Sequence, residues 1–390
     1  MTCREPTGAQ ASGPLATALE LAREWAGPSC RALLLSGSHA SGEAIWIEEE
    51  GRSLSISDVD LYAILSDANA CRAAASRRRA ATPGLASRLR ALGLAAPLEV
   101  AFLTARDLAR LPARPATLEL ARGARVIAGD AAALRLVPAY RADQITGEEM
   151  LLLLENRAFE LLAAHASLDA TPLERRRARH EVLKCALDLA GVLCLAAGEY
   201  PVGAAARVER ARRGGGFVPG LDALWERALA WRREPIAWAS PEAARAEWQD
   251  VVRAWAAVWD RLATARGAPG RTAYERAVAL AGRARIRRRV RQALQFPTRS
   301  GAGPDAWERL RFALRGTPQH RLNASAVLLL LAAAAAGGAD APPTLPEPAR
   351  RALRALGVLP SRLSFGAAAA AAVRLWDQWV LDGQRTAEPA

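Results

Sequence analysis

Two aspartates separated by a single valine, inside a run of aliphatic residues, limit most strongly what this chain can fold into. The run is Ser57-Asp58-Val59-Asp60-Leu61-Tyr62-Ala63-Ile64, and its β-branched and aliphatic residues favour a buried strand. Side chains alternate between the faces of a strand, so Asp58 and Asp60 are expected on one face, about 7 Å apart at roughly 3.3 Å per residue. Two such carboxylates repel each other and resist losing water. A divalent cation relieves both problems, and hard oxygen ligands of this kind suit Mg²⁺.

The segment before this run predicts a phosphate site. Leu33-Leu34-Leu35 is typical of a first buried strand, and the strand breaks at Gly37-Ser38 before a helical start. Free backbone N–H groups and a hydroxyl at the start of a helix favour a bound phosphate. A phosphate turn followed by an acidic pair favours a metal–nucleotide site. The alternative interpretation places Asp58 and Asp60 on the solvent face of an edge strand.

The Gly37-Ser38 turn and the Asp58-Val59-Asp60 triplet together resemble the pattern of the nucleotidyltransferase superfamily, which includes DNA polymerase β and the aminoglycoside nucleotidyltransferases. That pattern adds a third acid on a later strand. Here the third acid would be Glu99, in the strand-like run Pro97–Leu103. The resemblance covers roughly the first third of the chain. The interval between the turn and the triplet is longer than is usual in the superfamily.

The resemblance implies transfer of a nucleoside monophosphate from an NTP, with ATP as the favoured donor, to a hydroxyl acceptor, with release of pyrophosphate. Asp58, Asp60 and Glu99 would hold two Mg²⁺ ions, or Glu99 would act as the general base for the acceptor proton. Gly37 and Ser38 would bind the β- and γ-phosphates. By analogy with the family, the acceptor is expected to be a small hydroxyl compound, with an RNA end or a protein side chain as the alternatives. The alternative is a catalytically silent nucleotide-binding or antitoxin-like regulatory protein on the same fold.

Lys184 is a further candidate, because it is the single lysine among the 53 lysine and arginine residues. Where every other basic residue is arginine, a retained lysine indicates a need for a compact ammonium group instead of a wide planar guanidinium. One phosphate oxygen in a tight site is such a need. Lys184 is therefore predicted to neutralise charge on the triphosphate. A leftover lysine on a solvated helical turn is the alternative.

The fold expected from these features is α+β, with a nucleotidyltransferase domain in residues 1–140. This domain would be a small mixed β-sheet with flanking helices. Its strands are expected near residues 31–35, 56–65, 97–103 and 125–130, with a helix that begins near His39 and carries Gly42-Glu43. The polar residues Glu48–Arg52 predict an inserted hairpin or loop that accounts for the long interval before the triplet.

The rest of the chain predicts an all-α region. By analogy with the family, residues 141–270 would form a helical bundle that walls the active-site cleft, and residues 271–390 a C-terminal helical domain. Trp248, Trp255 and Trp259 recur at helical spacing and predict a buried face.

Two polar features also lie in this region. Asn156-Arg157 interrupts an apolar helix and predicts a polar contact that binds helices together. The basic segment Ala281–Leu294 predicts a solvated face, with contact to a phosphate-bearing partner as the minority interpretation.

Composition narrows the partners and the compartment. The formal net charge of +13 ordinarily favours a polyanion, but an Ala-, Arg- and Gly-rich composition raises arginine content independently of function, so nucleic acid is not favoured. Five cysteines without a C-x-x-C motif predict free thiols in a reducing compartment. The apolar run Ala324–Ala336 is shorter than the about 20 residues that span a bilayer and predicts a core helix. We therefore expect a cytoplasmic protein without a membrane partner.

Overall fold

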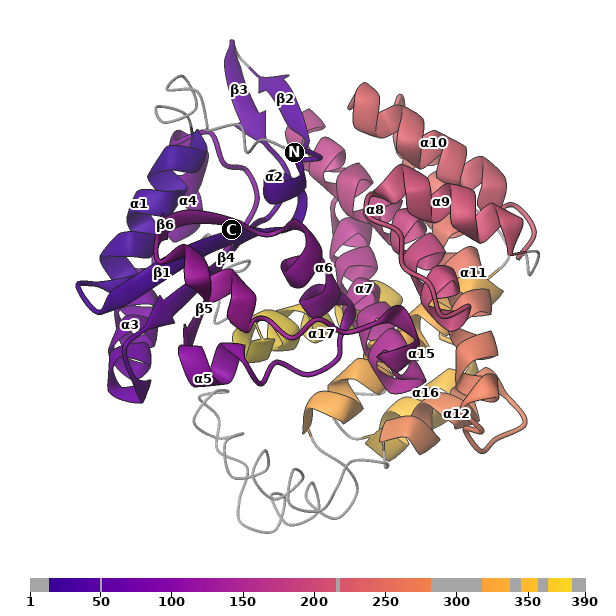
Figure 1. Ribbon diagram of the computed structural model, residues 1–390. Coiled ribbons are helices and arrows are strands. Elements are labelled where there is room, and N and C mark those ends of the chain that lie inside the picture. Colours follow the sequence, from indigo (N-terminus) through magenta and orange to yellow (C-terminus); the bar gives the residue numbers. More distant parts are fainter. Residues whose placement is uncertain are drawn as a thin grey trace. The chain divides into compact units, whose positions relative to one another are not determined.

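The computed structural model describes residues 14–49, 51–214, 218–281, 318–336, 345–356 and 364–380 (Figure 1). All strands of this described part precede residue 130, and helices follow, so the α+β prediction is confirmed at this level. The described residues form two compact units. The first contains the residues up to Thr146 together with Cys194–Arg207, and the second contains Gly147–Leu193 and the residues from Val208 on. Each unit is described separately.

The first unit contains a four-stranded mixed sheet in the order β5-β4-β1-β6. The strands are β1 (Cys30–Ser36), β4 (Val59–Leu65), β5 (Leu98–Thr104) and β6 (Arg125–Gly129). Strand β1 pairs antiparallel with β4 and β6, while β4 and β5 pair in parallel. The four strands expected from the sequence are therefore present, and the edge strand near residues 125–130 is confirmed.

The acidic strand begins later than predicted, at Val59 instead of Ile56. Asp58 therefore lies in the connection before the strand. The reason is that Ile56 and Ser57 are bound to Ile45: the Ile56 amide donates to the Ile45 carbonyl at 3.0 Å, and the Ile45 amide donates to Ser57 Oγ at 2.9 Å. These bonds end the preceding strand and turn the chain into β4.

The inserted hairpin is confirmed. Strands β2 (Trp46–Glu49) and β3 (Arg52–Ser55) form a two-stranded antiparallel sheet with Glu49 opposite Arg52, and the hairpin projects from the first unit (Figure 1). The preceding helix α2 (Gly37–Ser41) starts before His39 and ends before Gly42, which adopts the left-handed conformation. The observed start at Gly37 is near the expected one, but the expectation that this helix carries Gly42-Glu43 was wrong, because α2 ends at Ser41 and Gly42 caps it.

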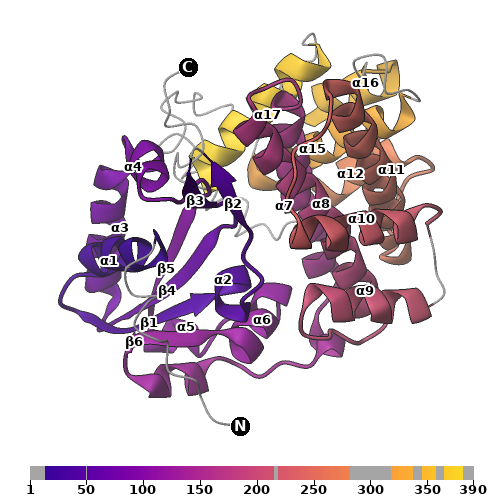
Figure 2. The same ribbon diagram turned by 90° about the horizontal axis from the view of Figure 1, so that it is seen from above.

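Helices cover both faces of the sheet (Figure 2). Helices α1 (Pro14–Ala26), α3 (Ala68–Ala81) and α4 (Leu85–Ala91) pack on the face that carries Leu33, Leu61 and Val100. Helices α5 (Ala105–Leu108) and α6 (Pro115–Gly123) and the short helix η2 (Ala131–Leu136) pack on the opposite face, against Leu34 and Ile64. A second short helix, η3 (Ala142–Gln144), precedes the end of this part of the unit.

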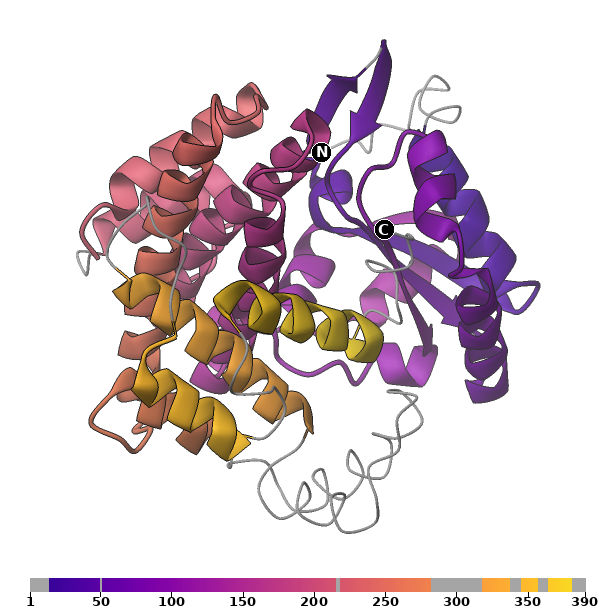
Figure 3. The same cartoon turned by 180° about the vertical axis from the view of Figure 1, so that it is seen from behind.

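Helices make up the second unit (Figure 3). They are α7 (Gly147–Ala166), α8 (Pro172–Ala196), α9 (Ala204–Arg213), α10 (Leu221–Arg233), α11 (Pro241–Ala265), α12 (Ala273–Ala281), α15 (Pro318–Ala335), α16 (Glu347–Leu356) and α17 (Phe365–Val380). The last turn of α8 and the first turn of α9 belong to the first unit.

The structure divides the chain differently from the three expected domains. Helix α15 packs on α7, α11 and α12, and α17 packs on α7 and α15. The helices after residue 271 therefore share one core with those before it, and the boundary expected at residue 270 does not separate two units. The first unit also extends to Thr146 instead of residue 140 and regains Cys194–Arg207 from within the helical region.

The tryptophan face of α11 lies in this core, as predicted. Trp248, Trp255 and Trp259 are buried, and the indole N–H groups of Trp248 and Trp255 donate to backbone carbonyls of α7. Most side chains of α15 are buried as well, which confirms the expected core helix. Of the basic segment Ala281–Leu294, all but Ala281 lies outside the described residues. In the described chain, no helix combines the length and the apolarity needed to cross a bilayer.

Candidate active site

The strand register brings two of the predicted acids together. Asp60 on β4 lies directly opposite Glu99 on the parallel strand β5, so both side chains project from the same face, with the strands about 4.8 Å apart. Their neighbours Leu61 and Val100 project from the other face into the core. Both acids are half-buried. Glu99 therefore lies on the same side of the sheet as Asp60, the arrangement that a shared cation requires.

The Gly37 turn lies against the same carboxylate. Gly37 adopts a positive φ of 67°, and a Cβ atom built on it would lie 2.3 Å from Asp60 Oδ2. Two features therefore disfavour any side chain at position 37: the left-handed backbone and the close approach of the Asp60 carboxylate. Because a phosphate on the Gly37-Ser38 turn would stand beside this carboxylate, it would need a cation between the two charges.

Asp58 precedes the strand that carries Asp60. The amide of the next residue, Val59, donates to the carbonyl of Pro97 at 3.1 Å, which fixes the chain just after Asp58 to the start of β5. Asp58 also lies close enough to His39 to raise its pKa, although burial outweighs this effect and lowers the pKa of His39 below its usual value. The first unit therefore holds Asp58 near α2.

The donor set fits Mg²⁺ held by a carboxylate pair. Within the described residues, no group of three Asp, Glu, His or Cys side chains lies in an arrangement that could hold a metal ion. The in-register pair Asp60 and Glu99 supplies two hard oxygen ligands. Mg²⁺ is usually bound by one or two carboxylates together with substrate phosphates, and the adjacent Gly37-Ser38 turn is where such phosphates are expected.

Tyr62 extends the acidic face. It follows Asp60 by one full strand repeat and therefore projects from the same face. Burial, and after it the charges of Asp60, Glu119 and Glu99, raise the pKa of Tyr62 to about 12. Glu119, on α6, thus lies within electrostatic reach of the strand pair. The sequence analysis did not single out Tyr62 or Glu119.

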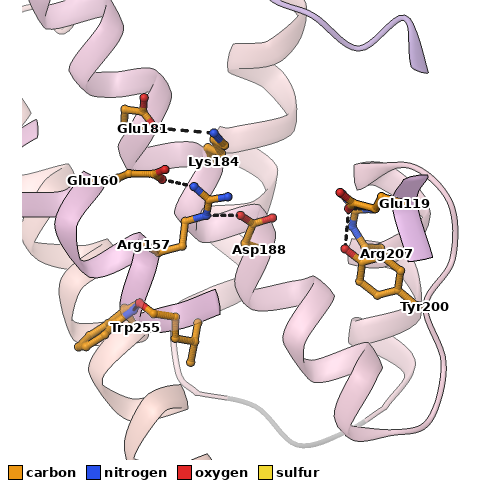
Figure 4. A network of polar contacts seen from close by, with 10 residues as sticks. Glu119, Arg157, Glu160, Glu181, Lys184, Asp188, Tyr200, Arg207 and Trp255 are labelled. Carbon is orange, nitrogen blue, oxygen red and sulfur yellow. Dashed lines mark hydrogen bonds and ion pairs between the residues drawn. The ribbon is translucent and has the colours of Figure 1, made fainter. Parts of the chain in front are cut away.

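A distant segment of the chain contacts Glu119. The Tyr200 hydroxyl donates to Glu119 Oε1 at 2.7 Å, and Arg207 Nη1 lies 3.4 Å from the same atom (Figure 4). The guanidinium of Arg207 also stacks over the Tyr200 ring at 5.1 Å. At the start of α9, the Ala204 amide donates to Glu43 Oε1 at 3.2 Å. Nothing in the local sequence around Tyr200 and Arg207 indicates these contacts with distant residues.

Lys184 belongs to the second unit, whereas the carboxylate pair belongs to the first. It lies on α8, with Nζ 4.0 Å from Glu181 Oε2, and its side chain is about one quarter exposed, at 26%. A partly solvated helical turn is the setting of the alternative interpretation, in which Lys184 is a leftover lysine. Its predicted contact with a triphosphate stays a prediction.

Arg157 confirms the expected polar contact between helices. Its Nε donates to Asp188 Oδ2 on α8 at 2.5 Å, and its Nη1 bonds with Glu160 on its own helix (Figure 4). Burial opposes the charge of Arg157, but Glu160 and Asp188 outweigh it and hold the pKa of Arg157 well above its usual value. Arg157 therefore links α7 to α8 and has a structural role.

Comparisons with models of protein families, with curated protein sequences and with solved structures gave no match for this chain. What the site can do is therefore inferred from its own residues: a carboxylate pair on one face of a sheet, a glycine turn against it, and a second layer formed by Tyr62, Glu119, Tyr200 and Arg207.

Proposed function

We propose that this protein is a Mg²⁺-dependent nucleotidyltransferase that moves a nucleoside monophosphate from an NTP, preferably ATP, to a hydroxyl acceptor and releases pyrophosphate. The in-register pairing of Asp60 with Glu99, with the Gly37 backbone against the Asp60 carboxylate, is the observation that supports this proposal most directly. The same features support a nucleotidyltransferase fold: strand, Gly-Ser turn, acidic strand and third acid follow in the expected order on one mixed sheet.

The chain's own residues account for the chemistry. Asp60 and Glu99, with Asp58 beside them, would hold Mg²⁺, which when bound neutralises charge on the phosphates. In the alternative role, Glu99 would not bind the metal but would act as the general base that takes the proton of the acceptor hydroxyl as the hydroxyl oxygen attacks the α-phosphorus. A new O–P bond forms, the bond from the α-phosphorus to the bridging oxygen breaks, and pyrophosphate leaves.

Phosphate binding would rely on backbone groups of the turn. Without a side chain at Gly37, the backbone can approach the β- and γ-phosphates closely, and the Ser38 amide and hydroxyl can donate to them. Helix α2 is a single turn, so these individual donors, and not a long helix dipole, would bind the phosphates. Lys184 remains our candidate for neutralising the triphosphate.

The test uses the full chain with Mg²⁺, each of the four NTPs labelled on the α-phosphate, and a cell metabolite extract as the source of acceptors. We expect an extract component to gain the mass of one nucleotide, with equal release of pyrophosphate. Asp60→Asn should lower the rate by about 100-fold or more, since it removes a metal ligand. Glu24→Gln, which neutralises an exposed acid on α1, is the matched control and should leave the transfer rate unchanged.

Two outcomes would decide against the proposal. NTP binding without transfer to any component of the extract would favour the catalytically silent nucleotide-binding protein. Equal transfer rates for the Asp60→Asn variant and the wild type would show that the chemistry occurs elsewhere.

A further inference from the structure

His39 is a buried histidine directly after the Gly37-Ser38 turn. Its side chain is 7% exposed, and its Nε2 lies 3.2 Å from the Ser57 carbonyl oxygen and 3.1 Å from Ser55 Oγ. The imidazole edge meets the Trp46 ring at right angles, with 5.8 Å between centroids. The ring therefore joins α2 to the base of the β2–β3 hairpin.

The hydrogen-bond partners of His39 indicate which nitrogen of its ring carries the hydrogen. A carbonyl oxygen only accepts, so Nε2 carries the hydrogen and donates it to the Ser57 carbonyl. The Ser55 hydroxyl donates to the same carbonyl at 3.3 Å and can accept from Nε2 at the same time. A neutral imidazole protonated on Nε2 therefore gives a hydrogen-bond partner to Nε2, to the Ser57 carbonyl and to the Ser55 hydroxyl.

This network fixes the short link between the hairpin and the acidic strand. His39 and Ser55 hold the Ser57 carbonyl, and the Ile45 amide donates to the Ser57 hydroxyl at 2.9 Å. Ser57 is thus held at its backbone and at its side chain, and the next residue is Asp58. Without such bonds, an inserted hairpin would leave the residue before β4 free to move, because a link of this kind has many conformations.

We propose that His39 is a positioning residue of the nucleotidyl-transfer site: it ties the phosphate turn to the Ser55–Ser57 link and thereby fixes Asp58 beside Gly37-Ser38. This inference rests on the proposed function. His39 touches neither substrate nor metal in this scheme and acts through the backbone of Ser57. Substitution of a residue that orients a metal ligand typically lowers metal affinity or activity by about 10- to 100-fold.

Two substitutions at His39 separate positioning from simple packing. His39→Phe fills the space but removes the Nε2 hydrogen, whereas the side-chain amide of His39→Gln can still donate to the Ser57 carbonyl. The readouts are kcat and KM for the NTP in the presence of Mg²⁺, the affinity for Mn²⁺ measured by electron paramagnetic resonance without nucleotide, and the melting temperature by circular dichroism.

We expect His39→Phe to lower kcat by about 10- to 100-fold and to weaken Mn²⁺ binding by a similar factor, with KM changed by about 3-fold or less. His39→Gln should restore both quantities to within about 5-fold of the wild type. Ser55→Ala, which removes one of the two groups that hold the Ser57 carbonyl, should give a smaller loss and serves where His39→Phe fails to fold.

His165→Phe is the matched control, because His165 is a half-buried histidine of the second unit that contacts aromatic rings. It should change the melting temperature but neither kcat nor Mn²⁺ affinity. If the wild type is active and both His39→Phe and Ser55→Ala leave kcat and Mn²⁺ affinity unchanged, the role of His39 is overturned while the proposed function stands. The same holds if His39→Gln is as impaired as His39→Phe. A wild type without transfer and without Mn²⁺ binding would overturn the proposed function and this inference with it.

Discussion

At the scale of single residues, Gly37 is a position of the candidate site with little freedom to change. Its backbone is left-handed, and the Asp60 carboxylate occupies the space where a side chain would begin. Gly84 offers a comparison, since it has a similar φ of 75° but no atom within 4 Å of an added Cβ. The difference between the two glycines isolates the effect of the contact with Asp60.

Gly37→Ala should therefore destabilise the protein more than Gly84→Ala. The left-handed backbone costs an alanine about 1–2 kcal/mol at either position, and displacement of the Asp60 carboxylate should add about 1–3 kcal/mol at Gly37. Nucleotidyl transfer should fall by about 100-fold in the Gly37→Ala variant only. Melting temperatures and turnover of the two variants check this, and equal effects at both glycines would contradict it.

At the scale of elements, one polar contact lies inside the helical core of the second unit. The Asn323 side-chain amide on α15 donates to Glu155 Oε2 on α7 at 2.8 Å, and Asn323 is 2% exposed. Burial, opposed by this bond and assisted by the charge of Glu148, raises the pKa of Glu155 to about 7. We therefore expect the protonation of Glu155 to affect the packing of α15 on α7.

Glu155→Gln should stabilise the protein at alkaline pH. The pKa of Glu155 is higher in the folded state, so the folded protein binds this proton more tightly than the unfolded chain does. The free energy of unfolding therefore falls as the pH rises from about 4.5 towards 7. The loss should reach about 3 kcal/mol above pH 7, and the glutamine side chain avoids this loss while its oxygen still accepts from Asn323. Unfolding in urea at pH 4.5 and pH 8 checks this.

The gain should appear at pH 8 and be small at pH 4.5. Glu234→Gln, which alters an exposed acid at the end of α10, should show no such dependence on pH. A gain of equal size at both pH values would mean that Glu155 is not the titrating group.

At the scale of the whole molecule, the chain leaves the first unit at Thr146, forms α7 and most of α8, and returns to the first unit over Cys194–Arg207. The returning segment binds α6 through three polar contacts: Tyr200 and Arg207 both donate to Glu119, and Arg122 Nη1 donates to the Tyr200 carbonyl at 2.6 Å. Within the residues that the structure describes, the first unit is therefore built from two separate parts of the sequence.

Tyr200→Phe should loosen α6 although the substitution lies in the returning segment. Loss of a hydrogen bond to a charged group costs about 1.5–3 kcal/mol, and we expect faster hydrogen exchange in peptides from α6 and from Cys194–Arg207. Tyr274→Phe removes a hydroxyl from a half-buried tyrosine of the second unit and should leave α6 unchanged. Exchange that rises only near the substituted residue would contradict the prediction.

Local patterns in the sequence were sufficient to predict part of this structure. The alternation around Asp60 and the apolar runs before Gly37 and around Glu99 specify strands whatever lies beside them, and the polar residues between Trp46 and Ser55 specify a hairpin. The start of β4 at Val59 was not predictable, because hydrogen bonds to Ile45 determine it.

Features that depend on contacts between distant residues left no local signal. From its position in the sequence, His39 is expected to be a polar residue in the first turn of a helix. In the structure it is buried and contacts Ser55 and Ser57. Tyr200 and Arg207 lie in a helical region and contact Glu119 of the first unit. The shared core of α7, α11, α15 and α17 depends on which apolar faces meet, and periodicity identifies such faces but not their partners.

The parallel pairing of β4 with β5 has a consequence for the order in which this protein assembles. Parallel neighbours need a crossover connection, and here α3 and α4 form it, so Asp60 and Glu99 meet only after that crossover has packed on the sheet. Such non-local pairing is slow compared with helix formation. During refolding, helical content should thus recover well before the metal binding that we propose for Asp60 and Glu99.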